Sequence, residues 1–81
     1  MPEPQPRTLS EFGRRLRDAR VDAGYSQESL SHECGLHRTY IGSVERGERN
    51  ISLLNVVTLS RSLGIDPGEL VAGLGESFAE D

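Results

Sequence analysis

The stretch from residue 26 to residue 46, SQESLSHECGLHRTYIGSVER, constrains the fold of this chain more than any other. It predicts one short helix that Ser26 caps and that ends at Gly35, where the backbone must turn and a Cβ would clash. A second helix is expected over about Arg38–Arg46. Apolar residues at helical spacing mark the inward sides of the two helices: Leu30, Cys34, Ile41 and Val44.

Two short helices around a tight turn are the layout of a helix-turn-helix, in which the second helix enters the DNA major groove. Arg38 lies at the start of that helix and suits a bidentate contact with guanine. Gln27 opens the first helix, where its side chain and the free backbone amides are placed to hold a phosphate. The residues that we expect to contact DNA are Gln27, Arg38, Thr39, Tyr40, Ser43, Arg46, Arg49 and Asn50.

Several of these residues have a second interpretation. Thr39 suits either a phosphate or the methyl group of a thymine. Tyr40 either presents its ring to DNA or packs half-buried against the preceding helix. Arg46 either binds a phosphate or only complements the dipole at the end of its helix. Gln27 and Arg49 are either phosphate contacts or ordinary solvated side chains.

From about Phe12 to Leu70 the chain resembles the lambda-repressor-like (Cro/repressor, or XRE) helix-turn-helix family. The resemblance rests on SQESL, GLHRTYI, ERGERN and SLLNVVTLSRSLGI. Within the family, LHRTYI and VERGERNIS are most similar to the controller proteins of bacterial restriction-modification systems. Ser31 departs from the pattern, since most members carry Ala on this packed side of the first helix of the motif.

The resemblance implies roles for individual residues. In controller-like relatives the triplet that begins at Arg38 contacts DNA, and Gln is the usual family residue at position 27. Arg20 and Glu45 match positions that form an internal ion pair in phage-repressor relatives; the alternative is that both are exposed and unpaired. Controller-like members also pair through the C-terminal end of the domain.

The rest of the sequence completes an all-α fold, with no strand pattern. Thr8–Glu11 has the spacing of a capping box for a helix that Gly24 ends. Another helix is expected over Leu53–Leu63, and Asp66–Glu69 carries the start signal of a last helix that runs to about Leu74. We therefore expect a compact five-helix, lambda-repressor-like DNA-binding domain.

The chain has 81 residues, enough for one small domain. Residues 1–7 hold three prolines and no apolar run, so we expect a disordered arm rather than a signal peptide. Residues 8–74 are predicted to be the helix-turn-helix DNA-binding and dimerisation domain. Residues 75–81 have no periodicity and are predicted to be a flexible acidic tail.

The distribution of charge is compatible with DNA binding although the net charge is −4. Residues 7–49 hold eight Arg against seven acids, whereas residues 50–81 hold one Arg against five acids. Every cation is Arg, whose planar donor fork suits phosphate and guanine. Genome composition explains this usage equally well, but not the positions. Acids and Arg three or four apart, as in Glu11, Arg14 and Arg15, indicate a solvated face.

The C-terminal part holds more apolar side chains than one small core needs. One set within residues 53–63 is enough to face the core of the domain. We expect a second set to form a homodimer interface: Leu54, Ile65, Leu70, Val71 and Leu74. The alternative is that these residues cover the core of a five-helix monomer.

We therefore expect a sequence-specific transcriptional regulator, a repressor or an activator, that binds a double-stranded operator as a homodimer. A restriction-modification controller protein is one version of this function. Two-fold pairing would set the recognition helices about 34–36 Å apart, so the operator should be an approximate palindrome. The alternative is an antitoxin, or a protein-interaction module on the same fold without an independent operator.

No residue pattern indicates an enzyme, a cofactor or a small-molecule ligand. His32, Cys34 and His37 lack the number and spacing of a zinc site, so we expect no metal. One Cys cannot form an internal disulfide, and no apolar run approaches the roughly 18 residues of a membrane span. We expect a cytoplasmic protein that is nucleoid-associated when bound.

Overall fold

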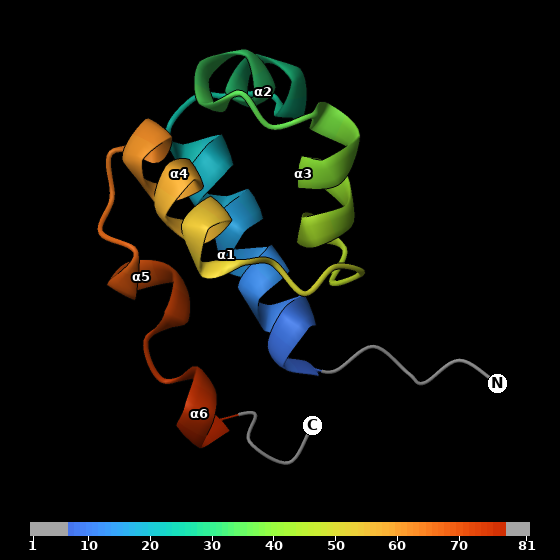
Figure 1. Ribbon diagram of the computed structural model, residues 1–81. Coiled ribbons are helices and arrows are strands. Elements are labelled where there is room, and N and C mark those ends of the chain that lie inside the picture. Colours follow the sequence, from blue (N-terminus) through green and yellow to red (C-terminus); the bar gives the residue numbers. More distant parts are fainter. Residues whose placement is uncertain (1–6, 78–81) are drawn as a thin grey trace, which may run out of the picture.

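The computed structural model describes residues 7–77, and this part of the chain is built from helices and short connections (Figure 1). The helices are α1 (Arg7–Asp22), α2 (Gln27–Cys34), α3 (Arg38–Glu45), α4 (Leu53–Leu63), α5 (Gly68–Val71) and α6 (Leu74–Ser77). α1 runs through the centre, α2 lies over one end in contact with α3 and α4, and α3 and α5 lie on opposite sides of α1 (Figure 1). The predicted all-α fold is confirmed.

The structure differs from the prediction near both ends. α1 begins at Arg7, so Thr8 lies inside its first turn and residue 7 belongs to the domain rather than to the predicted arm. The predicted last helix is two helices, because Ala72 is extended and Gly73 adopts a left-handed conformation with φ of 76°. The predicted tail from residue 75 therefore begins inside α6. Residues 1–6 of the arm and 78–81 of the tail lie outside the described residues.

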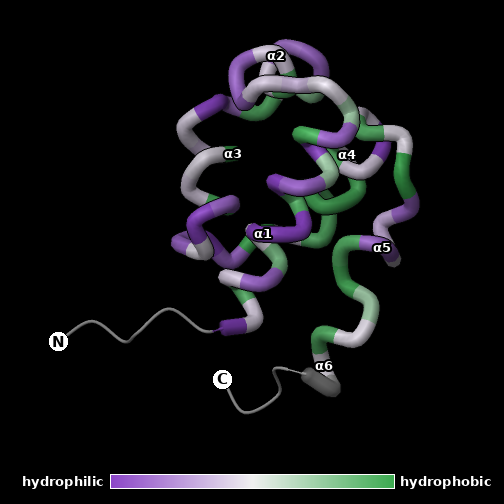
Figure 2. The backbone as a smooth tube through the Cα atoms, turned by 180° about the vertical axis from the view of Figure 1, so that it is seen from behind, coloured by the Kyte–Doolittle hydropathy of each residue, from purple (hydrophilic) through white to green (hydrophobic). Residues whose placement is uncertain are grey.

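The hydrophobic core is contributed by α1 to α5. Figure 2 shows hydrophobic residues concentrated along α4, α5 and the start of α6. The start signal of the last predicted helix is present, since Asp66 Oδ2 accepts from the Gly68 amide and Glu69 Oε2 accepts from the Asp66 amide. This turn places Leu70 in the core. The buried hydrophobic cluster consists of Phe12, Leu16, Leu30, Ile41, Val44, Val56, Leu59, Leu63 and Leu70.

The backbones of α1 and α3 approach each other at Gly13. A Cβ at this position would overlap the main-chain carbonyl oxygens of Val44 and Glu45. The obstacle is backbone, so no change of side-chain rotamer would relieve it. Gly13 therefore allows the C-terminal part of α3 to lie directly on α1.

Gly13→Ala is expected to lower the free energy of unfolding by about 2–3 kcal/mol, the upper part of the range for overpacking, because two helix backbones must separate. The matched control is Gly75→Ala in α6, where a Cβ would meet no atom within 4 Å. That variant should be as stable as the wild type or slightly more so. Urea unfolding followed by circular dichroism measures both, and equal midpoints for the two variants would contradict the close crossing.

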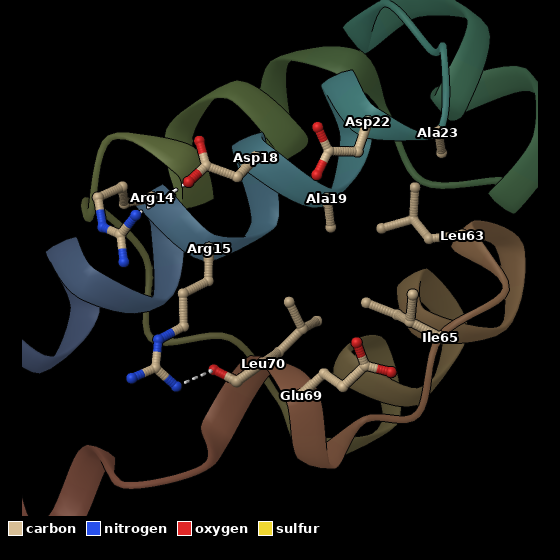
Figure 3. Close-up of a pocket in the computed structure, with 10 residues that line it drawn as sticks. All are labelled: Arg14, Arg15, Asp18, Ala19, Asp22, Ala23, Leu63, Ile65, Glu69 and Leu70. Atoms are coloured by element: carbon tan, nitrogen blue, oxygen red, sulfur yellow. Dashed lines mark hydrogen bonds and ion pairs between the residues drawn. The ribbon is translucent and has the colours of Figure 1, made fainter.

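Arg15 of α1 holds α5 in place. Its Nη1 donates a hydrogen bond to the carbonyl oxygen of Leu70, at 3.3 Å (Figure 3), and another to that of Ala72, at 2.7 Å. Its Nε donates to Glu11, and the hydrogen bonds from Arg14 and Arg15 lower the pKa of Glu11 to about 2. The prediction of a solvated face was therefore wrong for Arg15, which satisfies carbonyls at the end of a short helix.

Candidate nucleic-acid interface

Polar side chains cap the starts of α2 and α3, and the predicted cap at Ser26 is present. Ser26 Oγ accepts from the Ser29 amide and Ser29 Oγ accepts from the Ser26 amide, both at 2.9 Å. Between the helices Gly35 has φ of 81°, a backbone conformation that favours glycine. His37 then caps α3, its Nδ1 accepting from the Thr39 amide at 3.1 Å. The turn between α2 and α3 is thus held by local hydrogen bonds.

A shallow hollow of about 200 Å³ lies where α2 and α3 meet. It is lined by Gln27 from α2 and by Arg38, Thr39, Gly42 and Arg46 from α3 and its end. Four of the eight residues predicted to contact DNA are therefore brought to one surface. The hollow is polar and open, which suits a charged, elongated partner better than a small apolar ligand.

An ion pair beneath this surface connects three helices. Arg20 Nε donates to Glu45 Oε2 at 2.7 Å, with only 11% of the Arg20 side chain and 4% of the Glu45 side chain exposed. Gln27 Nε2 donates to Glu45 Oε1 at 3.0 Å. The hydrogen bond from Arg20 to Glu45 raises the pKa of Arg20 despite its burial. The ion pair expected from the family resemblance is present, and it also engages Gln27.

Gly42 leaves the space in which side chains from α2 and α3 meet. A Cβ at Gly42 would lie 3.3 Å from Gln27 Oε1 and 3.2 Å from Arg46 Nη1. The absence of a side chain thus lets Gln27 lie across α3 while it binds Glu45. Arg46 remains exposed and forms an ion pair with Glu48 at 3.1 Å, which raises the pKa of Arg46.

Tyr40 packs within the domain rather than presenting its whole ring to solvent. It is half-buried against the hydrophobic core, and its hydroxyl accepts from Asn55 Nδ2 of α4 at 3.1 Å. The guanidinium of Arg49 lies 6.0 Å from the ring centre, at the limit of a cation–π contact. The sequence did not reveal Asn55 as a partner. The only signal was a polar residue inside the apolar run LLNVV.

The burial of Ser43 argues against its predicted DNA contact. Only 8% of Ser43 is exposed, and its Oγ donates to the carbonyl oxygen of Tyr40 at 2.7 Å. A serine inside a helix commonly satisfies its hydroxyl on the preceding turn in this way. Arg38, Thr39, Arg49 and Asn50 are exposed, so their side chains remain available to a partner.

The residues predicted for the dimer interface divide into three groups. Leu54 and Val71 are 73% and 44% exposed, which fits a surface that a second molecule covers. Ile65 and Leu74 are partly buried against the core. Leu70 is only 1% exposed and lies inside the core, so its assignment to the interface is corrected. The sequence missed Leu53, which is 79% exposed because the helix turns it away from the core.

A second, larger hollow of about 410 Å³ lies away from α3, between α1 and the connection from α4 to α5 (Figure 3). Its floor includes Leu63 and Ile65, and acids such as Asp22 and Glu69 line its rim.

Among the side chains that the structure describes, within residues 7–75, no three His, Cys, Asp or Glu are grouped so that they could hold a metal ion. None of the helices described is both long and apolar enough to span a membrane.

The chain is similar to known control proteins. The helix-turn-helix family matches residues 16–70. Control protein C.BamHI of Bacillus amyloliquefaciens is 48% identical over 61 residues, which are 74% of this chain and 75% of that protein. Control protein C.SmaI of Serratia marcescens is 48% identical over 60 residues, 74% of this chain and 71% of that protein.

Solved structures show the same relationship. The restriction-modification controller protein C.AhdI from Aeromonas hydrophila matches with a TM-score of 0.75 and 52% identity, covering 76% of this chain and 94% of that chain. The controller protein C.Esp1396I, solved as a tetramer with its natural 35 base-pair operator, matches with a TM-score of 0.74 and 25% identity. The match covers 89% of this chain and 95% of that chain. The chain therefore belongs to the helix-turn-helix family that includes these control proteins.

Proposed function

We propose that this protein is a transcriptional regulator that binds a palindromic double-stranded operator as a homodimer, in the role of a restriction-modification controller. The observation that carries the proposal is the polar surface of Gln27, Arg38, Thr39 and Arg46, which the ion pair of Glu45 holds in place. The relatives support it, since C.Esp1396I is described in complex with its operator. In this role the protein acts by binding rather than by catalysis, in the bacterial cytoplasm.

The residues of the surface divide into base contacts and phosphate contacts. Arg38, the first residue of α3, is placed to read guanine through its planar fork. Arg46, Arg49 and Asn50 follow α3 and are placed to bind phosphates beside the groove. Gln27 donates one hydrogen of its side-chain amide to Glu45, and the other hydrogen remains available to a phosphate at the start of α2.

The proposed dimer surface is an apolar face around the start of α4 and the end of α5. Leu53, Leu54 and Val71 are its exposed members. Leu53 and Val71 also line an apolar hollow of about 280 Å³ together with Phe12 and Leu74. Exposed apolar side chains that adjoin such a hollow are typical of an interaction surface.

Leu54→Glu is expected to give a folded, helical monomer that binds operator poorly. The side chain is 73% exposed, so a carboxylate there costs the monomer little but would be buried without a partner in the dimer. Sedimentation velocity at tens of micromolar measures the change, with circular dichroism as the check of folding. Leu70→Glu is the contrasting variant and should unfold, because Leu70 is in the core. A wild-type protein that sediments at 8.9 kDa would contradict the homodimer.

Selection from randomised duplex DNA tests the proposed function directly. The protein should enrich a sequence with two related half-sites, and a gel shift with random competitor should confirm the preference. Genes for an endonuclease and a methyltransferase beside the coding sequence would support the controller role. A neighbouring toxin gene, or no enrichment of any sequence, would favour an antitoxin or an interaction module instead.

A further inference from the structure

His37 and Thr39, at the start of α3, are joined by two contacts that determine where their hydrogens lie. The Thr39 amide donates to His37 Nδ1 at 3.1 Å, and Thr39 Oγ1 lies 2.7 Å from the same nitrogen. An amide N–H only donates, and a proton on Nδ1 would face the amide proton. Nδ1 is therefore an acceptor, the ring proton is on Nε2, and the Thr39 hydroxyl hydrogen points at Nδ1.

This arrangement limits what Thr39 offers a partner. Its side chain is exposed and lines the hollow between α2 and α3 beside Arg38. With its hydrogen on His37, Oγ1 has lone pairs to offer but no hydrogen to donate. Phosphate oxygens, guanine O6 and thymine O4 are acceptors only. In the major groove, hydrogens are offered by the amino groups of adenine N6 and cytosine N4.

We propose that His37 sets the hydrogen-bond polarity of Thr39, so that Thr39 reads one operator position by accepting from the amino group of adenine or cytosine. A phosphate contact by the Thr39 hydroxyl is then excluded unless the bond to His37 breaks. This inference rests on the proposed function and deepens it. His37 is a positioning residue, which acts through Thr39 rather than on the base.

The test begins with operators selected by the wild type and by Thr39→Val, which keeps the shape of the side chain and removes the hydroxyl. The position at which Thr39→Val loses its preference is the position that Thr39 reads. Every base pair offers one amino group in the major groove, adenine N6 or cytosine N4, so the polarity is tested by removing that group. Replacing adenine with purine, or cytosine with 2-pyrimidinone, removes the amino group. This should weaken wild-type binding about two- to tenfold, the value of one neutral hydrogen bond, and leave Thr39→Val unaffected.

Variants of His37 distinguish an effect on the hydrogen-bond polarity of Thr39 from an effect of His37 as the N-cap of α3. In His37→Ala the Thr39 hydroxyl is free to donate as well as accept. The sequence preference at that position, and the loss of affinity when its amino group is removed, should therefore become smaller, while other positions keep their preferences. His37→Asn supplies an acceptor at the cap and should restore the preference. Ser52→Ala, which removes the cap of α4 from the Asn55 amide, is the matched control and should leave all preferences unchanged.

Several results would overturn the proposal. His37→Ala could weaken all sequences equally and keep the wild-type preference at the Thr39 position, which would make His37 a cap only. Unchanged wild-type binding after removal of the amino group at that base pair, or no position affected by Thr39→Val, would be equally decisive. If His37→Ala does not fold, the amino-deleted operators with wild type and His37→Asn give the answer. A wild type that enriches no sequence is a distinct result, in which the proposed function itself fails.

Discussion

Arg38→Ala is expected to abolish the preference for operator while weak binding to any DNA remains. Arg38 is exposed at the first position of α3 and lines the polar hollow with Gln27 and Thr39. A bidentate contact to guanine contributes about 1–3 kcal/mol of discrimination, and a homodimer would make it in both half-sites. The combined loss of about 2–6 kcal/mol lowers the specificity ratio by roughly 30-fold to 10⁴-fold. Affinities for operator and scrambled DNA at one salt concentration give this ratio.

Arg49→Ala and Gln27→Ala serve as the controls for this experiment, because both residues are assigned to phosphate contacts. Each should weaken operator and scrambled DNA to a similar extent, since phosphate contacts carry no sequence information. An unchanged ratio in Arg38→Ala would show that Arg38 does not read a base. A loss confined to operator DNA in Arg49→Ala would show that Arg49 belongs among the base-reading residues.

Glu45→Ala is expected to lower the free energy of unfolding by about 3–5 kcal/mol, the cost of removing one partner from a buried ion pair. The change would leave Arg20 buried, and it would also remove the acceptor of Gln27 Nε2. Glu48→Ala is the matched control, because the ion pair of Glu48 with Arg46 is exposed and contributes about 0–1 kcal/mol. Thermal unfolding of the two variants should therefore differ widely.

A double-mutant cycle with Arg20→Met separates the pair from the individual side chains. If the ion pair is the source of the effect, the double variant should be more stable than the sum of the single losses predicts. Similar melting temperatures for Glu45→Ala and Glu48→Ala would contradict a stabilising role for the buried pair.

The local signals in the sequence predicted the helices well. Ser26, His37 and Ser52 act as caps, and Gly35 and Gly64 end helices in the left-handed conformation, because these interactions involve neighbouring residues. Such signals are readable without knowledge of the fold. The division of the last predicted helix at Gly73 was not anticipated, since a glycine is tolerated inside a helix unless tertiary contacts favour an end.

Long-range contacts explain the errors in the predicted site. The sequence placed Ser43 among the residues that contact DNA, but Ser43 lies with Ile41 and Val44 among the buried residues of α3. The contacts of Tyr40 with Asn55, and of Arg15 with the end of α5, join residues 15 and 55 positions apart. No spacing rule predicts such pairs. The pairing of Arg20 with Glu45 was expected only through the family resemblance.

The hydrogen bonds from Arg15 to the end of α5 have a consequence for the spacing of the two half-sites that a dimer would bind. Arg15 ties the carbonyls of Leu70 and Ala72 to α1, and α1 meets α3 backbone to backbone at Gly13. The apolar face and α3, the helix proposed to read bases, therefore belong to one rigid unit. A symmetric pair of such units would hold its two α3 helices at a fixed separation. Each base pair inserted between half-sites rotates one of them by about 34°, and five place it on the opposite side of the duplex. Spacing would then be recognised as strictly as sequence.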